Sequence, residues 1–175
     1  VLSIDAENQL AVVEPGVRNL AISEAVSEYD LYYAPDPSSQ IACTIGGNVA
    51  ENSGGVHCLK YGLTVHNIEA IKMLTMDGEE LILSRSDEGL GLLALMNGSE
   101  GLLGVITEIT VKLTKKPALA KLVMACFDTV RDCANAVADI IKAGIVPAGL
   151  EMMDKFADLN VQEFDLDQII SDSKK

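Results

Sequence analysis

Residues 35–62 read PDPSSQIACTIGGNVAENSGGVHCLKYG, a region of glycines, small hydroxyl side chains and asparagines that holds no catalytic acid–base pair. Glycines let a ligand come close to the backbone, and free N–H groups can point at its phosphate or ring oxygens. Thr44 is a suitable N-cap for a short helix ending near Asn52, whose N-terminus would favour an anion. The region therefore predicts a cradle for a polar, flat ligand.

Composition alone leaves a second interpretation of this region open. Glycine also punctuates ordinary loops, so tight turns explain the pattern about as well as a ligand cradle does. Neither G-x-G-x-x-G after a strand nor G-x-x-x-x-G-K-[S/T] occurs in the chain, so no standard nucleotide motif decides between the two. Pro35 and Pro37 make residues 34–38 an extended, stiff segment.

The flanking segments predict an α+β fold. Apolar side chains recur with the period of a strand or of a helix, and the Asp-Gly pair at 77–78 is a strong hairpin signal. In chain order, the expected elements are a hairpin of strands at 2–4 and 10–13, a helix at 17–28, a hairpin of strands at 68–76 and 79–83, a short helix at 90–96 and a strand at 105–113.

A second domain is expected to begin after Lys115-Lys116-Pro117. Thr129 and Asp132 resemble the capping box of a helix, and Gly144 is placed to end it. Strands are expected on either side of this helix, at 119–127 and at 148–152. We therefore divide the chain into a first domain at 1–117 and an incomplete second domain at 118–175.

Charge and composition exclude several classes of partner. The 175 residues carry 13 Lys and Arg against 26 Asp and Glu, a net charge of −13, which argues against nucleic acid and against a polybasic membrane anchor. No apolar run reaches the length of a membrane-spanning helix, about 18 residues. The four cysteines form no C-x-x-C pair, so we expect reduced thiols in a cytosolic protein and no metal site.

Both ends of the sequence are expected to be cuts in a longer chain. It opens at Val1 in what reads as a strand, without a signal peptide, and from about residue 157 its apolar periodicity gives way to acidic and polar residues.

Four motifs, in order, resemble one family. YYAPDPSSQ at 32–40, TIGGNVAENSGG at 44–55, HCLKYG at 57–62 and GSEGLLGVIT at 98–107 are similar to segments of the FAD-linked 2-hydroxyacid oxidases. This family shares its flavin-binding fold with vanillyl-alcohol oxidase and with D-lactate dehydrogenases. The resemblance implies that residues 1–117 are the C-terminal portion of such an FAD-binding domain and that 118–175 begin a ferredoxin-like cap domain.

The resemblance also implies which residues contact FAD. Pro37, Ser38 and Ser39 would face the flavin, and Ser53 and Gly54 would lie near the isoalloxazine. The full set of implied FAD-binding residues is Pro37, Ser38, Ser39, Thr44, Gly46, Gly47, Asn48, Asn52, Ser53, Gly54, Gly62, Gly101, Val105 and Ile106. The family's pyrophosphate loop is expected before Val1, and its substrate and metal ligands are expected in the cap after residue 160.

His57 and Lys60 are the candidate catalytic residues, because both would sit beside the flavin edge. They could orient a carboxylate substrate or stabilise reduced flavin; alternatively, His57 is a hydrogen-bonded loop residue and Lys60 a surface cation.

The implied activity is oxidation of glycolate, or a related short D-2-hydroxyacid, by hydride transfer to FAD. Electrons would then pass to partner subunits, one of them with iron–sulfur clusters, in a cytoplasmic complex held peripherally at the inner membrane. A D-lactate dehydrogenase-type enzyme and a non-catalytic FAD- or nucleotide-binding module are the alternatives.

Overall fold

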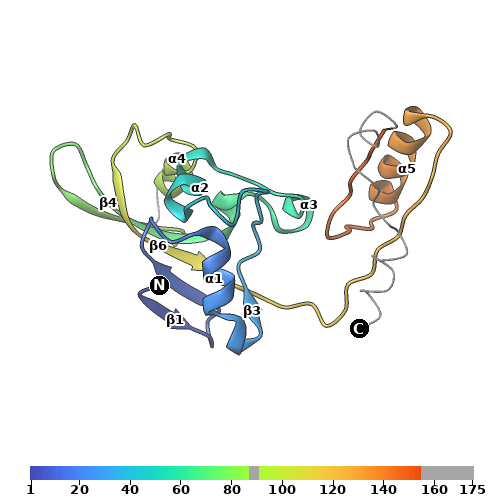
Figure 1. Ribbon diagram of the computed structural model, residues 1–175. Helices are drawn as coiled ribbons and strands as arrows, with labels where there is room; N and C mark the ends of the chain where they lie inside the picture. The colour runs from blue at the N-terminus through green and yellow to red at the C-terminus, as the bar shows by residue number, and fades with distance from the viewer. Residues whose placement is uncertain (87–90, 155–175) are drawn as a thin grey trace. The chain divides into compact units, whose positions relative to one another are not determined.

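The computed structural model describes residues 1–86 and 91–154 of the chain (Figure 1). It divides into two compact units, one made of residues 1–122 with 146–149 and one made of 123–145 with the residues from 150 onward. The acidic tail that begins at about residue 157 lies outside the described residues. The domain boundary expected at 117/118 stays a prediction.

An antiparallel sheet of five strands forms the centre of the first unit. Its order is β1 (Ser3–Asp5), β2 (Leu10–Val13), β6 (Val105–Lys112), β4 (Ile68–Leu74) and β5 (Glu80–Ser84). Figure 1 shows the blue β1 and β2 in one sheet with the yellow β6, and β2 pairs with β6 although about 100 residues separate the paired positions along the chain. Both expected hairpins are confirmed, β1 with β2 and β4 with β5.

The hydrophobic core is built from alternate residues of these strands and from the helices that pack on them. Val13, Ile71 and Ile109 are fully buried, as are Ile22 and Ile45 on the helices α1 (Asn19–Ala25) and α2 (Ile45–Glu51). Packing of β-branched side chains on a pleated surface and on one helix face explains both periodicities. Helices were expected in both places.

The remaining elements of the first unit are short. They are η1 (Ser27–Tyr29), β3 (Leu31–Tyr32), α3 (Cys58–Tyr61), η2 (Thr64–Asn67), α4 (Leu92–Met96) and β7 (Thr114–Lys115). Strands β3 and β7 pair with each other in a separate two-stranded sheet. The helix expected at 90–96 is thus confirmed as α4, and the strand expected at 105–113 as β6.

The second unit contains one helix, α5 (Val130–Lys142), among its described residues. As expected, the Thr129 side chain accepts a hydrogen bond from the Asp132 backbone N–H, at 3.1 Å. Gly144 follows the helix with a φ of 76°, the left-handed conformation that suits glycine.

The two strands expected on either side of α5 are wrong. Residues 119–127 and 148–152 have no regular secondary structure. A strand exists only through hydrogen bonds to a neighbouring strand, and no strand in the described part of the chain pairs with either segment. The apolar composition of these segments gave no information about such a partner.

Candidate functional site

Buried Asn19 fastens the segment around Pro35 to helix α1. Its side-chain Nδ2 donates to the Pro35 carbonyl at 2.9 Å, and its Oδ1 accepts from Asn48 Nδ2 at 2.8 Å. The backbone N–H of Asn19 donates to the Cys43 carbonyl at 3.0 Å. Because Asn19 and Asn48 are only 1% and 3% exposed, these bonds form away from water and fix both ends of the 35–48 loop.

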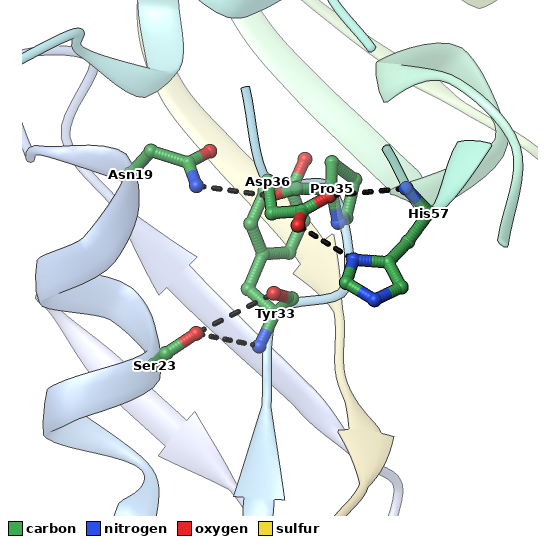
Figure 2. Close-up of polar contacts among 6 residues, drawn as sticks. All are labelled: Asn19, Ser23, Tyr33, Pro35, Asp36 and His57. Carbon is green, nitrogen blue, oxygen red and sulfur yellow. Dashed lines mark hydrogen bonds and ion pairs between the residues drawn. The ribbon is translucent and has the colours of Figure 1, made fainter. Parts of the chain in front are cut away.

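Ser23, one turn further along α1, holds the start of the same segment (Figure 2). Its Oγ accepts a hydrogen bond from the Tyr33 backbone N–H at 3.0 Å and donates to the Tyr33 carbonyl at 3.4 Å. The Tyr33 ring is buried, and this burial raises the pKa of its hydroxyl above the ordinary value. The segment that follows Tyr33 therefore leaves the hydrophobic core at a fixed position and in a fixed direction.

The turn after Pro37 presents two hydroxyl groups to solvent. The Gln40 N–H donates to the Pro37 carbonyl and the Cys43 N–H to the Ser39 carbonyl, each at 2.8 Å. These bonds use backbone groups only, and Ser38 and Ser39 are both exposed while Pro37 is buried. Of the three residues expected to face a flavin, the two serines have side chains free to do so.

Thr44 caps helix α2, as the sequence predicts, with its Oγ1 accepting from the Gly47 N–H at 3.3 Å. The two glycines that follow differ in their surroundings. A Cβ at Gly46 would lie 2.6 Å from the Pro15 Cβ, whereas a Cβ at Gly47 would meet only Thr44 Oγ1, at 3.4 Å. Gly46 therefore serves internal packing, and exposed Gly47 leaves open space beside the backbone. The Asn48 side chain is committed to Asn19.

The second group of expected contacts lies in the loop after α2 and is held by internal bonds. Asn52 Oδ1 accepts from the Val65 N–H at 2.9 Å, and the Ser53 carbonyl accepts from the Thr64 hydroxyl at 2.7 Å. A Cβ at Gly54 would lie 2.6 Å from Leu63 Cδ2. These contacts hold residues 52–54 against residues 63–65 at the start of η2.

Gly62 ends α3 in a conformation that favours glycine. Its φ is 77°, and a Cβ there would lie 2.6 Å from His66 Nδ1. The turn and the close packing explain this glycine without a ligand, in agreement with the interpretation that glycines in this region serve tight turns.

The third expected segment contacts the C-terminal part of α2 through its backbone. The Glu100 N–H, next to the exposed Gly101, donates to the Ala50 carbonyl at 3.0 Å. Ile106 and Pro15 line an open hollow of about 630 Å³. The Pro15 carbonyl accepts a hydrogen bond from the Gly46 N–H at 2.9 Å, which places the start of α2 next to this hollow. Val105 is exposed at the start of β6. The remaining lining residues of the hollow are Glu14, Gly16, Val17 and Thr107.

The two candidate catalytic residues lie on or next to α3. His57 Nδ1 is 2.6 Å from Asp36 Oδ2, so this pair joins the loop before α3 to the segment between the two prolines. Lys60 is exposed, with its Nζ 5.2 Å from the centre of the Tyr61 ring. Tyr61 in turn meets Tyr32 edge to face, with ring centres 6.2 Å apart. Partial burial and the neighbouring Tyr61 hydroxyl raise the pKa of Tyr32.

Three residues that shape this site were missed by the sequence reasoning: Pro15, Asn19 and Asp36. Asn19 shares a helix face with the buried Ile22 and Val26, and a polar residue on an apolar face is a signal for a buried hydrogen bond. An acidic residue enclosed by two prolines was a similar signal for Asp36. Nothing local to Pro15 indicates that α2 packs on it.

Comparison with known proteins defines the class to which this chain belongs. Residues 1–84 match the family described as FAD binding domain, and residues 116–167 match the family described as FAD linked oxidases, C-terminal domain. The chain therefore belongs to the FAD-linked oxidases, and its cofactor is FAD. The resemblance and the fold class expected from the sequence are confirmed.

Individual proteins similar to this chain include glycolate oxidase subunits and a D-lactate dehydrogenase. The chain is 58% identical over 167 residues to the glycolate oxidase subunit GlcD of Escherichia coli (strain K12), a match that covers 94% of this chain and 34% of the relative. It is 40% identical to the glycolate oxidase subunit GlcD of Bacillus subtilis (strain 168), over 94% of this chain and 36% of that one. It is 33% identical to a D-lactate dehydrogenase of Anaerostipes hadrus, over 94% and 35%. The chain thus spans about a third of the length of these curated relatives.

The exposed part of the cradle fits an FAD group. Ser38 and Ser39 offer hydroxyls, and the backbone at Gly47 is open to a close approach. The assignment of FAD contacts to single residues stays a prediction, as does the catalytic role of His57 and Lys60. No helix in residues 1–86 or 91–154 is long and apolar enough to cross a membrane.

Proposed function

We propose that this chain is part of a flavoenzyme that oxidises glycolate, or a related short D-2-hydroxyacid, to the 2-oxoacid, which is glyoxylate in the case of glycolate. The observation that carries the proposal is the 58% identity, over 94% of the chain, to a relative named as a glycolate oxidase subunit. The 33% identity to a D-lactate dehydrogenase makes that activity the second candidate.

FAD would be held by the exposed loop residues and would supply the hydride acceptor for the oxidation. Ser38, Ser39 and the open space beside Gly47 are the parts of this chain best placed to receive it, because both hydroxyls are exposed and a Cβ at Gly47 would meet only Thr44 Oγ1. Buried Asn48 and Gly46 contribute indirectly by fixing α2 against Asn19 and Pro15.

His57 and Lys60 would bind and orient the anionic substrate. The substrate carries a carboxylate, and the Lys60 ammonium is an exposed cation on α3. The only other cationic side chains between Arg18 and Lys72 are the two histidines, when they are protonated. A cation at this place would attract the carboxylate and would stabilise negative charge that develops during the reaction.

Electron transfer to partner subunits, including one with iron–sulfur clusters, completes the proposal. The description of these relatives as subunits supports an assembly. We place this assembly in the cytoplasm, peripheral to the inner membrane through its partners. The four free cysteines are consistent with a reducing compartment.

Steady-state kinetics of the full-length, FAD-loaded protein with an artificial electron acceptor test the proposal. We expect kcat/KM for glycolate to exceed that for D-lactate by about tenfold or more, because a pocket that fits one substrate discriminates against an extra methyl group by about this factor. A preference for D-lactate would favour the second candidate. No oxidation of either acid by a protein that retains FAD would indicate a non-catalytic flavin-binding module.

A further inference from the structure

Asp36 directs both of its carboxylate oxygens at His57 (Figure 2). Oδ2 lies 2.6 Å from the imidazole Nδ1, and Oδ1 accepts a longer hydrogen bond of 3.4 Å from the His57 backbone N–H. The Asp36 side chain is only 20% exposed, so this short contact is partly shielded from water. Charge-assisted bonds of this length are among the stronger hydrogen bonds in proteins.

The backbone on both sides holds this pair in place. Asp36 stands between two buried prolines, and the Pro35 carbonyl is bonded to buried Asn19. On the other side, a Cβ at Gly55 would collide with the Asp36 carbonyl group and carboxylate, so a glycine is needed for the two segments to approach. Such support on both sides is what a precisely oriented ring requires.

The pair determines which nitrogen of His57 carries hydrogen. A carboxylate can only accept, so Nδ1 must be the protonated nitrogen in the neutral ring. Nε2 is then the atom left for other partners, and the His57 side chain is 41% exposed. His66 is the opposite case, because its Nδ1 lies 3.0 Å from the Leu63 N–H and must accept from it. The chain's two histidines therefore hold opposite tautomers.

We propose that Asp36 is a positioning residue that fixes His57 in the Nδ1–H tautomer and presents Nε2 to the carboxylate of the bound hydroxyacid. The neutral Nδ1–H ring has only a lone pair at Nε2, so binding of the ligand takes up one proton from solvent at that nitrogen. The resulting Nε2–H donates to the ligand carboxylate, while Asp36 holds the ring plane and balances the charge. The ligand and its place beside Nε2 rest on the proposed function; the tautomer follows from the contacts alone.

Nitrogen-15 NMR of the 175-residue chain, labelled at histidine, tests the tautomer directly. At a pH where both rings are neutral, we expect His57 to favour Nδ1–H and His66 to favour Nε2–H, each by about tenfold or more. A His57→Gln variant assigns the two sets of signals. A wild-type His57 ring with its hydrogen on Nε2 would overturn the proposal without any variant.

Substitution of the carboxylate provides the second arm of the test. In Asp36→Ala, which removes the acceptor, the bias of His57 toward Nδ1–H should be lost, while unchanged His66 signals report that the fold is intact. Asp77→Ala, in the exposed turn between β4 and β5, is the matched control and should change neither ring. An Asp36→Ala protein whose His57 keeps the Nδ1–H form would contradict a positioning role.

Kinetics of the full-length, FAD-loaded protein then test whether the oriented His57 ring contacts the substrate. We expect Asp36→Ala to raise KM for glycolate about tenfold with its flavin content unchanged. An unchanged KM, with the NMR result as expected, would overturn the ligand contact. Wild-type protein that does not oxidise glycolate would instead refute the proposed substrate and leave the tautomer result standing.

Discussion

Replacement of Gly47 by valine separates a cofactor contact from a folding requirement, because the adjacent Gly46 provides a matched comparison. Both glycines belong to the first turn of α2, and neither has a positive φ. A side chain at Gly46 would lie 2.6 Å from the Pro15 Cβ and 3.0 Å from its carbonyl oxygen. A side chain at Gly47 would meet only Thr44 Oγ1, at 3.4 Å, and Gly47 is exposed.

These surroundings predict opposite effects of the same substitution. Gly46→Val must push α2 away from Pro15, and overpacking of this kind costs about 1–3 kcal/mol of stability or more. A Cβ at Gly47 meets only Thr44 Oγ1, at 3.4 Å, and valine is a slightly better helix residue than glycine, so the free energy of unfolding of Gly47→Val should change by less than about 0.5 kcal/mol. The valine would, however, fill the space in which FAD approaches the backbone, and bound flavin should be lost.

Both variants are made in the full-length protein and purified with added FAD. Circular dichroism with urea unfolding gives the stability, and the visible spectrum after gel filtration gives the ratio of flavin to protein. Gly47→Val should be folded and colourless, and Gly46→Val should be destabilised. A folded Gly47→Val protein with its full complement of flavin would refute the cradle, and an unfolded one would show that Gly47 is structural.

Three further predictions concern substrate, cofactor and pH. Lys60→Ala should slow reduction by glycolate about a hundredfold in stopped-flow measurements; a purely exposed lysine would leave both rate and melting temperature nearly unchanged. The 175-residue chain alone should lose added FAD on gel filtration, since it spans about a third of the relatives' length; stoichiometric yellow flavin after the column would contradict this. Burial raises the pKa of Tyr33 above its ordinary 10.0, so its contribution to stability is intact below pH 10 and is lost as the pH rises further. The free energy of unfolding in urea should therefore fall more steeply above pH 10 for wild type than for Tyr33→Phe. Equal pH dependence in the two proteins would contradict this role of Tyr33.

Local signals were sufficient for most elements of the first unit. The Asp-Gly turn predicts the β4–β5 hairpin, and Thr44 predicts where α2 begins, because each depends on neighbours within a few residues. The pairing of β2 with β6 depends instead on contacts about 100 residues apart, which alternation alone does not specify. The same reason explains why the strands expected at 119–127 and 148–152 are absent, because apolar composition does not specify a pairing partner and neither segment has one among the described residues.

The site was only partly predictable for a related reason. The sequence locates the cradle, but it does not distinguish Gly46, which packs on Pro15, from Gly47, which is open. It places Asn48 among the cofactor donors, whereas its amide is bonded to buried Asn19. Distant partners decide which polar groups remain available to a ligand, and they become visible only in three dimensions.

Anaerobic mixing of glycolate with the full-length, FAD-loaded protein tests the central claim most directly, because it needs no partner subunit or artificial acceptor. We predict that glycolate bleaches the visible flavin absorption in a single turnover and that one glyoxylate forms for each FAD reduced. A flavin that stays oxidised with glycolate, yet is readily bleached by a chemical reductant, would contradict the account.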